Sequence, residues 1–142
     1  MFVVNVEGAI LKDGKWLIIE RGSELGHAAG TLSLVGGQVE DEGNKYDIIE
    51  NTLKREILEE VGIEVKDNLK YVHSSSFLAD DGCKVIDIVL LCEHKNGVPF
   101  RNSPKEVANI YWMSTEEVIN HSKAPTWTKE SIKRADLLLH KY

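Results

Sequence analysis

Three carboxylates lie close together near the end of a predicted helix, in an unfavourable electrostatic environment. Glu56, Glu59 and Glu60 are spaced i, i+3 and i+4, so a helix places them on one face. Like charges at this spacing repel one another by about 0.2–0.5 kcal/mol per pair. The negative end of the helix dipole costs about a further 0.3–1 kcal/mol for each. This arrangement favours a site for a hard divalent cation, which binds through oxygen atoms.

An ordinary solvated helix face is the alternative interpretation of the same residues. Arg55 precedes Glu59 by four positions and can form an ion pair with it. On spacing alone this alternative is the better one, because most charge clusters on helices are exposed to water. The surrounding sequence adds support to the metal site.

An apolar stripe predicts a helix from about Asn44 to Val61. Its members recur at three- and four-residue spacing: Tyr46, Ile49, Leu53, Ile57 and Val61. Asn44 is expected to cap the first turn with Asp47 in a capping-box-like arrangement, and Gly62 is expected to end the helix. The acidic face lies beside the stripe, so the carboxylates are expected at the edge of the core. There a cation is bound more tightly than on an open surface.

Two glycines, Gly36 and Gly37, stand between a predicted strand over Thr31 to Val35 and this helix. The strand is expected to run into a glycine loop and then into an acidic loop. Paired glycines allow the backbone to approach a ligand or a metal closely. On its own, a Gly-Gly pair is more often a plain turn at the end of a strand.

Taken together, these residues resemble the signature of the Nudix hydrolase family, G-x5-E-x7-R-E-U-x-E-E-x-G-U, in which U is bulky and apolar. The segment from Arg55 to Ile63 matches at every specified position. The resemblance implies an α/β fold, the Nudix-type α/β/α sandwich around a mixed β-sheet, formed by one domain over residues 1–142. It extends weakly over the rest of the chain through its length and strand order.

The first half of the signature departs from the family pattern. Counting back from Arg55, the expected glutamate falls on Asp47. Gly37 lies 18 positions before Arg55, against 14 in the signature, so this chain carries about four extra residues. Asp47 can replace the missing glutamate with a shorter reach, or Glu40 or Glu42 can do so from a longer loop. The sequence leaves these placements open.

The resemblance implies a divalent-metal-dependent hydrolase that cleaves the diphosphate linkage of a nucleoside diphosphate derivative with Mg²⁺ or Mn²⁺. Nucleoside triphosphates, nucleotide sugars and ADP-ribose are small-molecule substrates of this kind. Glu56, Glu59 and Glu60 are the expected metal ligands with the carbonyl of Gly36, and Glu56 and Glu59 are also expected to be catalytic. A catalytically impaired Nudix-fold nucleotide-binding module is the alternative, because the first half of the signature is altered.

Four residues outside the helix are further candidates for the site. Glu106 follows Pro104 in a separate, mobile loop and is expected to be the general base, since metal ligands are poor bases. An exposed loop acid is its alternative. The resemblance implies that Arg21 and Gly37 contact the substrate, and a surface charge that closes a strand is the alternative for Arg21. Trp127 is assigned to stack on the nucleobase, although a tryptophan at a helix entrance is more often a hydrophobic staple or a core plug.

Composition narrows the class of protein. The 142 residues are 42% hydrophobic and 28% charged, as in ordinary soluble globular domains. A net charge of −6 and the lack of a basic stripe argue against a nucleic-acid polymer as partner. No signal peptide and no stretch of 18 apolar residues is found, so a cytoplasmic protein without a membrane partner is expected. Cys83 and Cys92 are expected to be buried and unpaired, and the resemblance is compatible with a homodimer.

The remaining pattern predicts two hairpins, one further strand and two more helices. A loop is expected over residues 22–30. The predicted hairpins turn at Asp13-Gly14 and at Asp81-Gly82. The other predicted elements are Val3–Leu11, Trp16–Arg21, Val72–Leu78, Val85–Cys92, Asn109–Met113, Thr115–His121 and Thr128–Leu139.

Overall fold

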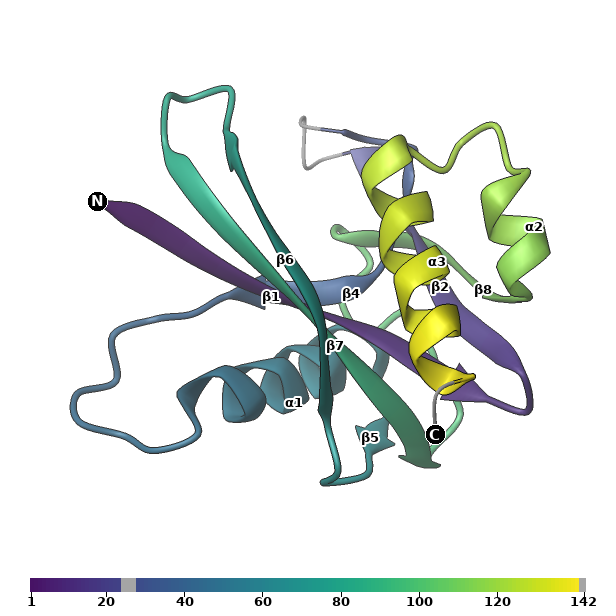
Figure 1. The fold of residues 1–142 in the computed structure, drawn as a ribbon, viewed down its shortest axis with the longest axis horizontal. Helices are drawn as coiled ribbons and strands as arrows, with labels where there is room; N and C mark the ends of the chain where they lie inside the picture. Colours follow the sequence, from purple (N-terminus) through teal and green to yellow (C-terminus); the bar gives the residue numbers. More distant parts are fainter. Residues whose placement is uncertain (24–27, 141–142) are drawn as a thin grey trace.

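The computed structural model describes residues 1–23 and 28–140 and shows a twisted sheet between helices (Figure 1). The elements follow in the order β1 Phe2–Lys12, β2 Lys15–Arg21, β3 Leu32–Ser33, β4 Val35–Gln38, α1 Ile48–Val61, β5 Glu64–Val65, β6 Lys70–Leu78, β7 Lys84–Asn96, β8 Val107–Met113, α2 Thr115–Ile119 and α3 Thr126–Leu139. The predicted loop over 22–30 includes 24–27, which lie outside the described residues.

The sheet is mixed, as predicted. β1 lies parallel to β7 and antiparallel to β2 and β4. β6 extends the sheet beyond β7, and β3 and β8 both pair with β2. Both predicted hairpins are confirmed. The parallel β1–β7 pair joins segments about 80 residues apart and brings the start of the chain into the middle of the sheet.

Two hydrophobic clusters cover the two faces of the sheet. Leu53, Ile57 and Val61 of α1 belong to one cluster, together with Val6 and Ile10 of β1. The other cluster joins the opposite face to α3 and contains Ala9, Trp16, Ile132 and Ala135. Neighbouring residues of β1 therefore point to different helices, as strand alternation requires. This arrangement confirms the expected α/β/α sandwich (Figure 1).

Helix α1 begins later than predicted. It starts at Ile48, and Asp47 before it adopts φ 56° with no side-chain capping bond, so the expected cap at Asn44 is wrong. The left-handed residue turns the chain sharply into the helix, and the residues before it cannot continue the helix. Tyr46 is 95% exposed and does not join the apolar stripe. The loop before the helix extends away from the sheet at the left of Figure 1. The predicted end at Gly62 is confirmed by its φ of 70°.

The predicted glycine loop is also wrong, because Gly36 and Gly37 lie inside strand β4. They pair with Glu7 and Val6 of β1. A Cβ atom on Gly36 would lie 2.1 Å from the Val6 carbonyl oxygen, so a residue without a side chain is needed for this pairing. The predicted strand over Thr31 to Val35 is split into β3 and β4, which pair with different strands.

Two smaller observations complete the fold. Cys92 is buried as expected, but Cys83 is exposed in the turn before β7. Both cysteines are free. No helix within residues 1–23 and 28–140 is long and apolar enough to cross a membrane.

Candidate active site

The three clustered glutamates in the second half of α1, Glu56, Glu59 and Glu60, differ in exposure. Glu60 is buried, with 9% of its surface exposed, and the Glu56 side chain is 18% exposed. The Glu59 side chain is 60% exposed. The prediction that the carboxylates lie at the edge of the core is therefore correct for Glu56 and Glu60 and wrong for Glu59.

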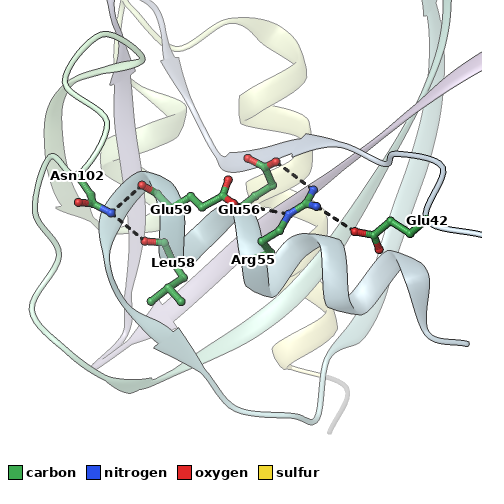
Figure 2. Close-up of polar contacts among 6 residues, drawn as sticks. All are labelled: Glu42, Arg55, Glu56, Leu58, Glu59 and Asn102. Carbon is green, nitrogen blue, oxygen red and sulfur yellow. Dashed lines mark hydrogen bonds and ion pairs between the residues drawn. The ribbon is translucent and has the colours of Figure 1, made fainter. Parts of the chain in front are cut away.

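Arg55 contacts three carboxylates at once (Figure 2). Its Nη1 lies 3.2 Å from Oε1 of Glu42, and its Nη2 lies 3.4 Å from Oε1 of Glu56. The pair with Glu59, on which the alternative interpretation rests, is the longest at 3.9 Å. Partly exposed ion pairs contribute little free energy, so the main effect of Arg55 is to orient these carboxylates.

The acidic loop reaches the helix through Glu42. Of the three residues considered for the missing signature glutamate, Glu42 is the one that Arg55 contacts among the described residues. Asp47 makes no capping bond with its side chain. The carboxylate that contacts Arg55 therefore comes from Glu42, five residues earlier in the chain than Asp47, where the signature places its glutamate.

Glu60 has the most strongly perturbed environment of the cluster. Burial, followed by a hydrogen bond and charge repulsion from Glu106, raises the pKa of Glu60 to about 9. A backbone hydrogen bond from Gly36 acts in the opposite direction. Burial and the charge of Glu59 also raise the pKa of Glu56, while Arg55 lowers it. The site therefore concentrates acidic groups whose ionisation the protein alone disfavours.

Glu106 reaches this cluster from a separate segment, and hydrogen bonds hold the backbone of that segment in place. The Gly22 N–H donates to the Glu106 carbonyl at 2.9 Å, and the Glu106 N–H donates to Ser103 O at 3.0 Å. Nε of Arg101 donates to Val107 O at 2.8 Å. The expected mobile loop is in fact a turn hydrogen-bonded on both sides. Glu106 is consequently held next to Glu60.

The carboxyl end of α1 is closed by residues that the sequence did not reveal. The last four carbonyls accept hydrogen bonds, namely Leu58 O from Gly62 N–H (3.0 Å), Glu59 O from Asn102 Nδ2 (2.9 Å), Glu60 O from Asn102 N–H (3.1 Å) and Val61 O from Phe100 N–H (3.0 Å). Figure 2 shows the Asn102 amide at Leu58 and Glu59. Helix carbonyls without a partner repel carboxylates, so these donors make the acidic last turn less costly.

The two glycines of β4 bring the backbone to the carboxylates. A Cβ atom on Gly37 would lie 2.3 Å from Cδ of Glu56. Gly37 therefore leaves room for the Glu56 carboxylate, and Gly36 provides the backbone hydrogen bond to Glu60. Gly37 was expected to contact substrate; the structure places it against Glu56.

The residues present fit an oxygen-bound cation in their chemistry. Oε2 of Glu60 is buried and has no hydrogen-bond partner in the described structure. Glu56 and Glu106 lie close enough to affect its pKa. All of these donors are hard oxygen atoms, as Mg²⁺ and Mn²⁺ prefer. Over residues 1–23 and 28–140, no three acidic, histidine or cysteine side chains lie together in an arrangement that could hold a metal ion.

A cavity of about 540 Å³ lies between residues of β1, β2, β3, β6 and β7 and the start of α3. Arg21 and Trp127, both expected to contact substrate, line it together with Ser33, Glu7 and Asp87. Trp127 is 62% exposed, so it is neither a core plug nor a buried staple. Glu7 interacts with the charges of both Arg21 and Glu60, which places the cavity beside the acidic cluster.

Comparison with solved structures gives the same fold. A MutT Nudix hydrolase from Burkholderia pseudomallei is 22% identical, with a TM-score of 0.80 over 94% of this chain and 98% of that one. A MutT protein from Methanosarcina mazei is 20% identical, with a TM-score of 0.79 over 97% and 95%. A Nudix hydrolase from Nitrosomonas europaea is 18% identical, with a TM-score of 0.78 over 96% and 90%.

Sequence comparison supplies the family. No curated protein sequence matches the chain. A family model for the NUDIX domain matches residues 2–135, which includes the signature helix and the elements on both faces of the sheet. The chain therefore belongs to the Nudix family of pyrophosphohydrolases, as the segment from Arg55 to Ile63 indicated.

Proposed function

We propose that the chain hydrolyses a diphosphate linkage in a nucleoside diphosphate derivative, using Mg²⁺ or Mn²⁺. The observation that carries the proposal is the buried Glu60 carboxyl, whose Oε2 has no partner and whose neighbours are further carboxyls. Such a group is costly unless a cation binds it. We take residues 1–142 as one catalytic domain, because β1 and α3 pack on the same sheet.

Glu56 and Glu60 are the principal ligands in this proposal, with Glu59 and the Gly36 carbonyl as additional ones. A bound divalent cation would neutralise diphosphate oxygens and lower the pKa of a water molecule. Arg55 holds Glu56 and Glu59 in position through the contacts described above.

The remaining roles follow from position. Glu106 accepts the proton of the attacking water, because it reaches the cluster from outside the helix and Gly22 fixes its backbone. Arg21 lines the cavity, and its Nε is buried without a hydrogen-bond partner among the described atoms. It therefore offers a cation to the phosphate chain. Trp127 offers an exposed aromatic face to the base.

A substrate panel tests the proposal. The purified chain is incubated with Mg²⁺ or Mn²⁺ and with nucleoside triphosphates, nucleotide sugars, ADP-ribose or dinucleoside polyphosphates, and ³¹P NMR follows cleavage. We expect turnover of at least one class, abolished by EDTA. Glu60→Gln should lose most of it, whereas Glu64→Gln, which removes an exposed carboxylate on β5, should retain it.

The alternative of a non-catalytic nucleotide-binding module makes a different prediction from the same panel. Its motivation is the altered first half of the signature, whose acidic loop contacts Arg55 through Glu42. Nucleotide binding measured by calorimetry on folded protein, with no cleavage under either metal, would establish that alternative and reject the hydrolase.

A further inference from the structure

Two carboxyl groups that line the cavity, Glu7 and Asp87, are hydrogen-bonded to each other, while Arg21 and His73 act on them only through their charges. Asp87 of β7 is paired in register with Asn5 of β1, and Glu7 follows two residues later on the same face. The two carboxyls hydrogen-bond to each other, and burial is the main reason that the pKa of each is raised. Over the described ranges, neither forms an ion pair with a lysine, arginine or histidine within 4.0 Å. The acidic pair (Glu7 and Asp87) therefore remains available to a ligand.

A separate observation also points to a ligand in this cavity. Ser33 is only 7% exposed, it lines the cavity, and its Oγ is buried with no hydrogen-bond partner in the part of the chain described. A buried hydroxyl without a partner costs about 1–3 kcal/mol. Ser33 lies on β3, whereas Glu7 and Asp87 lie on β1 and β7. The missing hydrogen-bond partner of Ser33 is therefore an observation independent of the acidic pair.

The rest of the lining suits a flat heterocycle. Trp127 and Phe77 line the cavity and are 62% and 47% exposed, so aromatic surface is available to a ligand. Whichever oxygen carries the proton shared by the acidic pair, the remaining oxygens are hydrogen-bond acceptors. An aromatic ligand with N–H donors on one edge would satisfy them.

Resting on the nucleotide substrate proposed above, we infer that Glu7 and Asp87 select the base and favour guanine. The guanine edge places a ring N–H beside an exocyclic amino group, so two neighbouring donors can meet carboxyl oxygens. Hypoxanthine keeps the ring N–H and lacks the amino group. Adenine and cytosine place a ring acceptor beside their amino group, and that acceptor would face a carboxyl oxygen. The carbonyl oxygen of guanine gives the Ser33 hydroxyl an acceptor.

Metal-free binding tests the inference without requiring catalysis. Calorimetry in EDTA compares GMP with IMP, which differ in the amino group alone. We expect the wild type to bind GMP at least tenfold more tightly, because IMP leaves a buried acceptor unpaired. Asp87→Asn should reduce this ratio to about threefold or less, since an amide presents donors of its own. Glu93→Gln, which removes a half-exposed carboxylate outside the cavity lining on the same strand, should leave the ratio unchanged.

Several outcomes would overturn the inference. These are equal affinity of the wild type for GMP and IMP, an unchanged ratio in Asp87→Asn, or no binding of either nucleotide. Thermal unfolding checks that Asp87→Asn is folded, and Asp87→Ser provides a second variant if it is not. With Mg²⁺, kcat/KM for GTP and ITP separates the two proposals. Turnover without discrimination rejects base selection alone, and selective binding without turnover of any substrate rejects the hydrolase alone.

Discussion

At the scale of single residues, the proposed site contains a carboxyl whose ionisation the folded protein disfavours. The pKa of Glu60 is raised to about 9, primarily by burial. In the unfolded chain an ordinary glutamate has a pKa of about 4.3. Between these two values the folded protein holds a proton that the unfolded chain has released. Unfolding then releases a proton, so the free energy of unfolding falls as pH rises across that interval.

This linkage predicts how the metal-free protein responds to alkali. From pH 6 to pH 9 in EDTA, the Tm of the wild type should fall more steeply than that of Glu60→Gln, which has no proton to lose at this position. Glu59→Gln is the matched variant, since it removes a carboxylate from an exposed position on the same helix, and it should follow the wild type. Differential scanning calorimetry measures the slopes. Parallel curves for wild type and Glu60→Gln would contradict the environment described for this residue.

Glu106 is the residue whose role is most directly open to kinetics. Glu106→Gln should lower kcat by about 10²-fold or more, the usual contribution of a general base, while KM changes much less. It should also flatten the acidic limb of the pH–rate profile. Glu64→Gln serves again as the control. If kcat stays within a few-fold of the wild type, the base must be sought among Glu56, Glu59 and the loop that contains Glu40.

At the scale of elements, β4 can lie close to both α1 and β1 because two of its residues are glycines, which have no side chain. A side chain on Gly37 would meet Cδ of Glu56, the far end of a flexible side chain. A side chain on Gly36 would meet the backbone of Val6 and Glu7, which cannot move without breaking the strand pairing. The two neighbouring glycines therefore have different reasons for lacking a Cβ atom.

This difference predicts opposite phenotypes for two adjacent substitutions. Gly37→Ala should keep most of its thermal stability but lose at least tenfold in kcat/KM, because Glu56 must move. Gly36→Ala should lower the Tm strongly, since its Cβ atom would lie 2.1 Å from a backbone oxygen. Calorimetry and steady-state kinetics on the same preparations compare them. Equal losses of stability in the two variants would show that Gly37 is needed for strand packing and not for the position of Glu56.

The same elements show which features a sequence can reveal. The end of α1 at Gly62 and the two hairpins were predictable because short local patterns determine them. The pairing of Gly36 with Glu7 was not predictable, because it depends on where a distant strand lies. Asn102 was missed for the same reason: its amide caps carbonyls more than 40 residues earlier, and no local pattern marks it. The left-handed Asp47 overrode a plausible capping box, so the start of the helix was placed too early.

At the scale of the whole molecule, the sheet separates the two groups of carboxyls to which we assign metal binding and base selection. The acidic cluster belongs to α1 and the edge at β4, whereas Glu7 and Asp87 face the layer that α3 covers. β1 connects them, because Val6 and Ile10 point to one layer while Glu7 and Ala9 point to the other. A nucleotide bound in the cavity would thus extend past Arg21 towards the carboxylates of the opposite layer. The sequence could not reveal this division, since Glu7 and Asp87 become neighbours only through the parallel β1–β7 pair.

This separation predicts that metal binding and base selection can be lost independently. Mg²⁺ should raise the Tm of Asp87→Asn as much as that of the wild type, because a ligand stabilises only through the site it occupies in the folded state. Glu60→Gln should lose most of that metal-induced shift. Conversely, Glu60→Gln should bind GMP in EDTA within about threefold of the wild type, whereas Asp87→Asn should lose its preference over IMP. Effects of distant substitutions add, so the double variant should show both losses and no more. A loss of metal stabilisation in Asp87→Asn would mean that Glu7, which interacts with Glu60 across the sheet, couples the two sites into one.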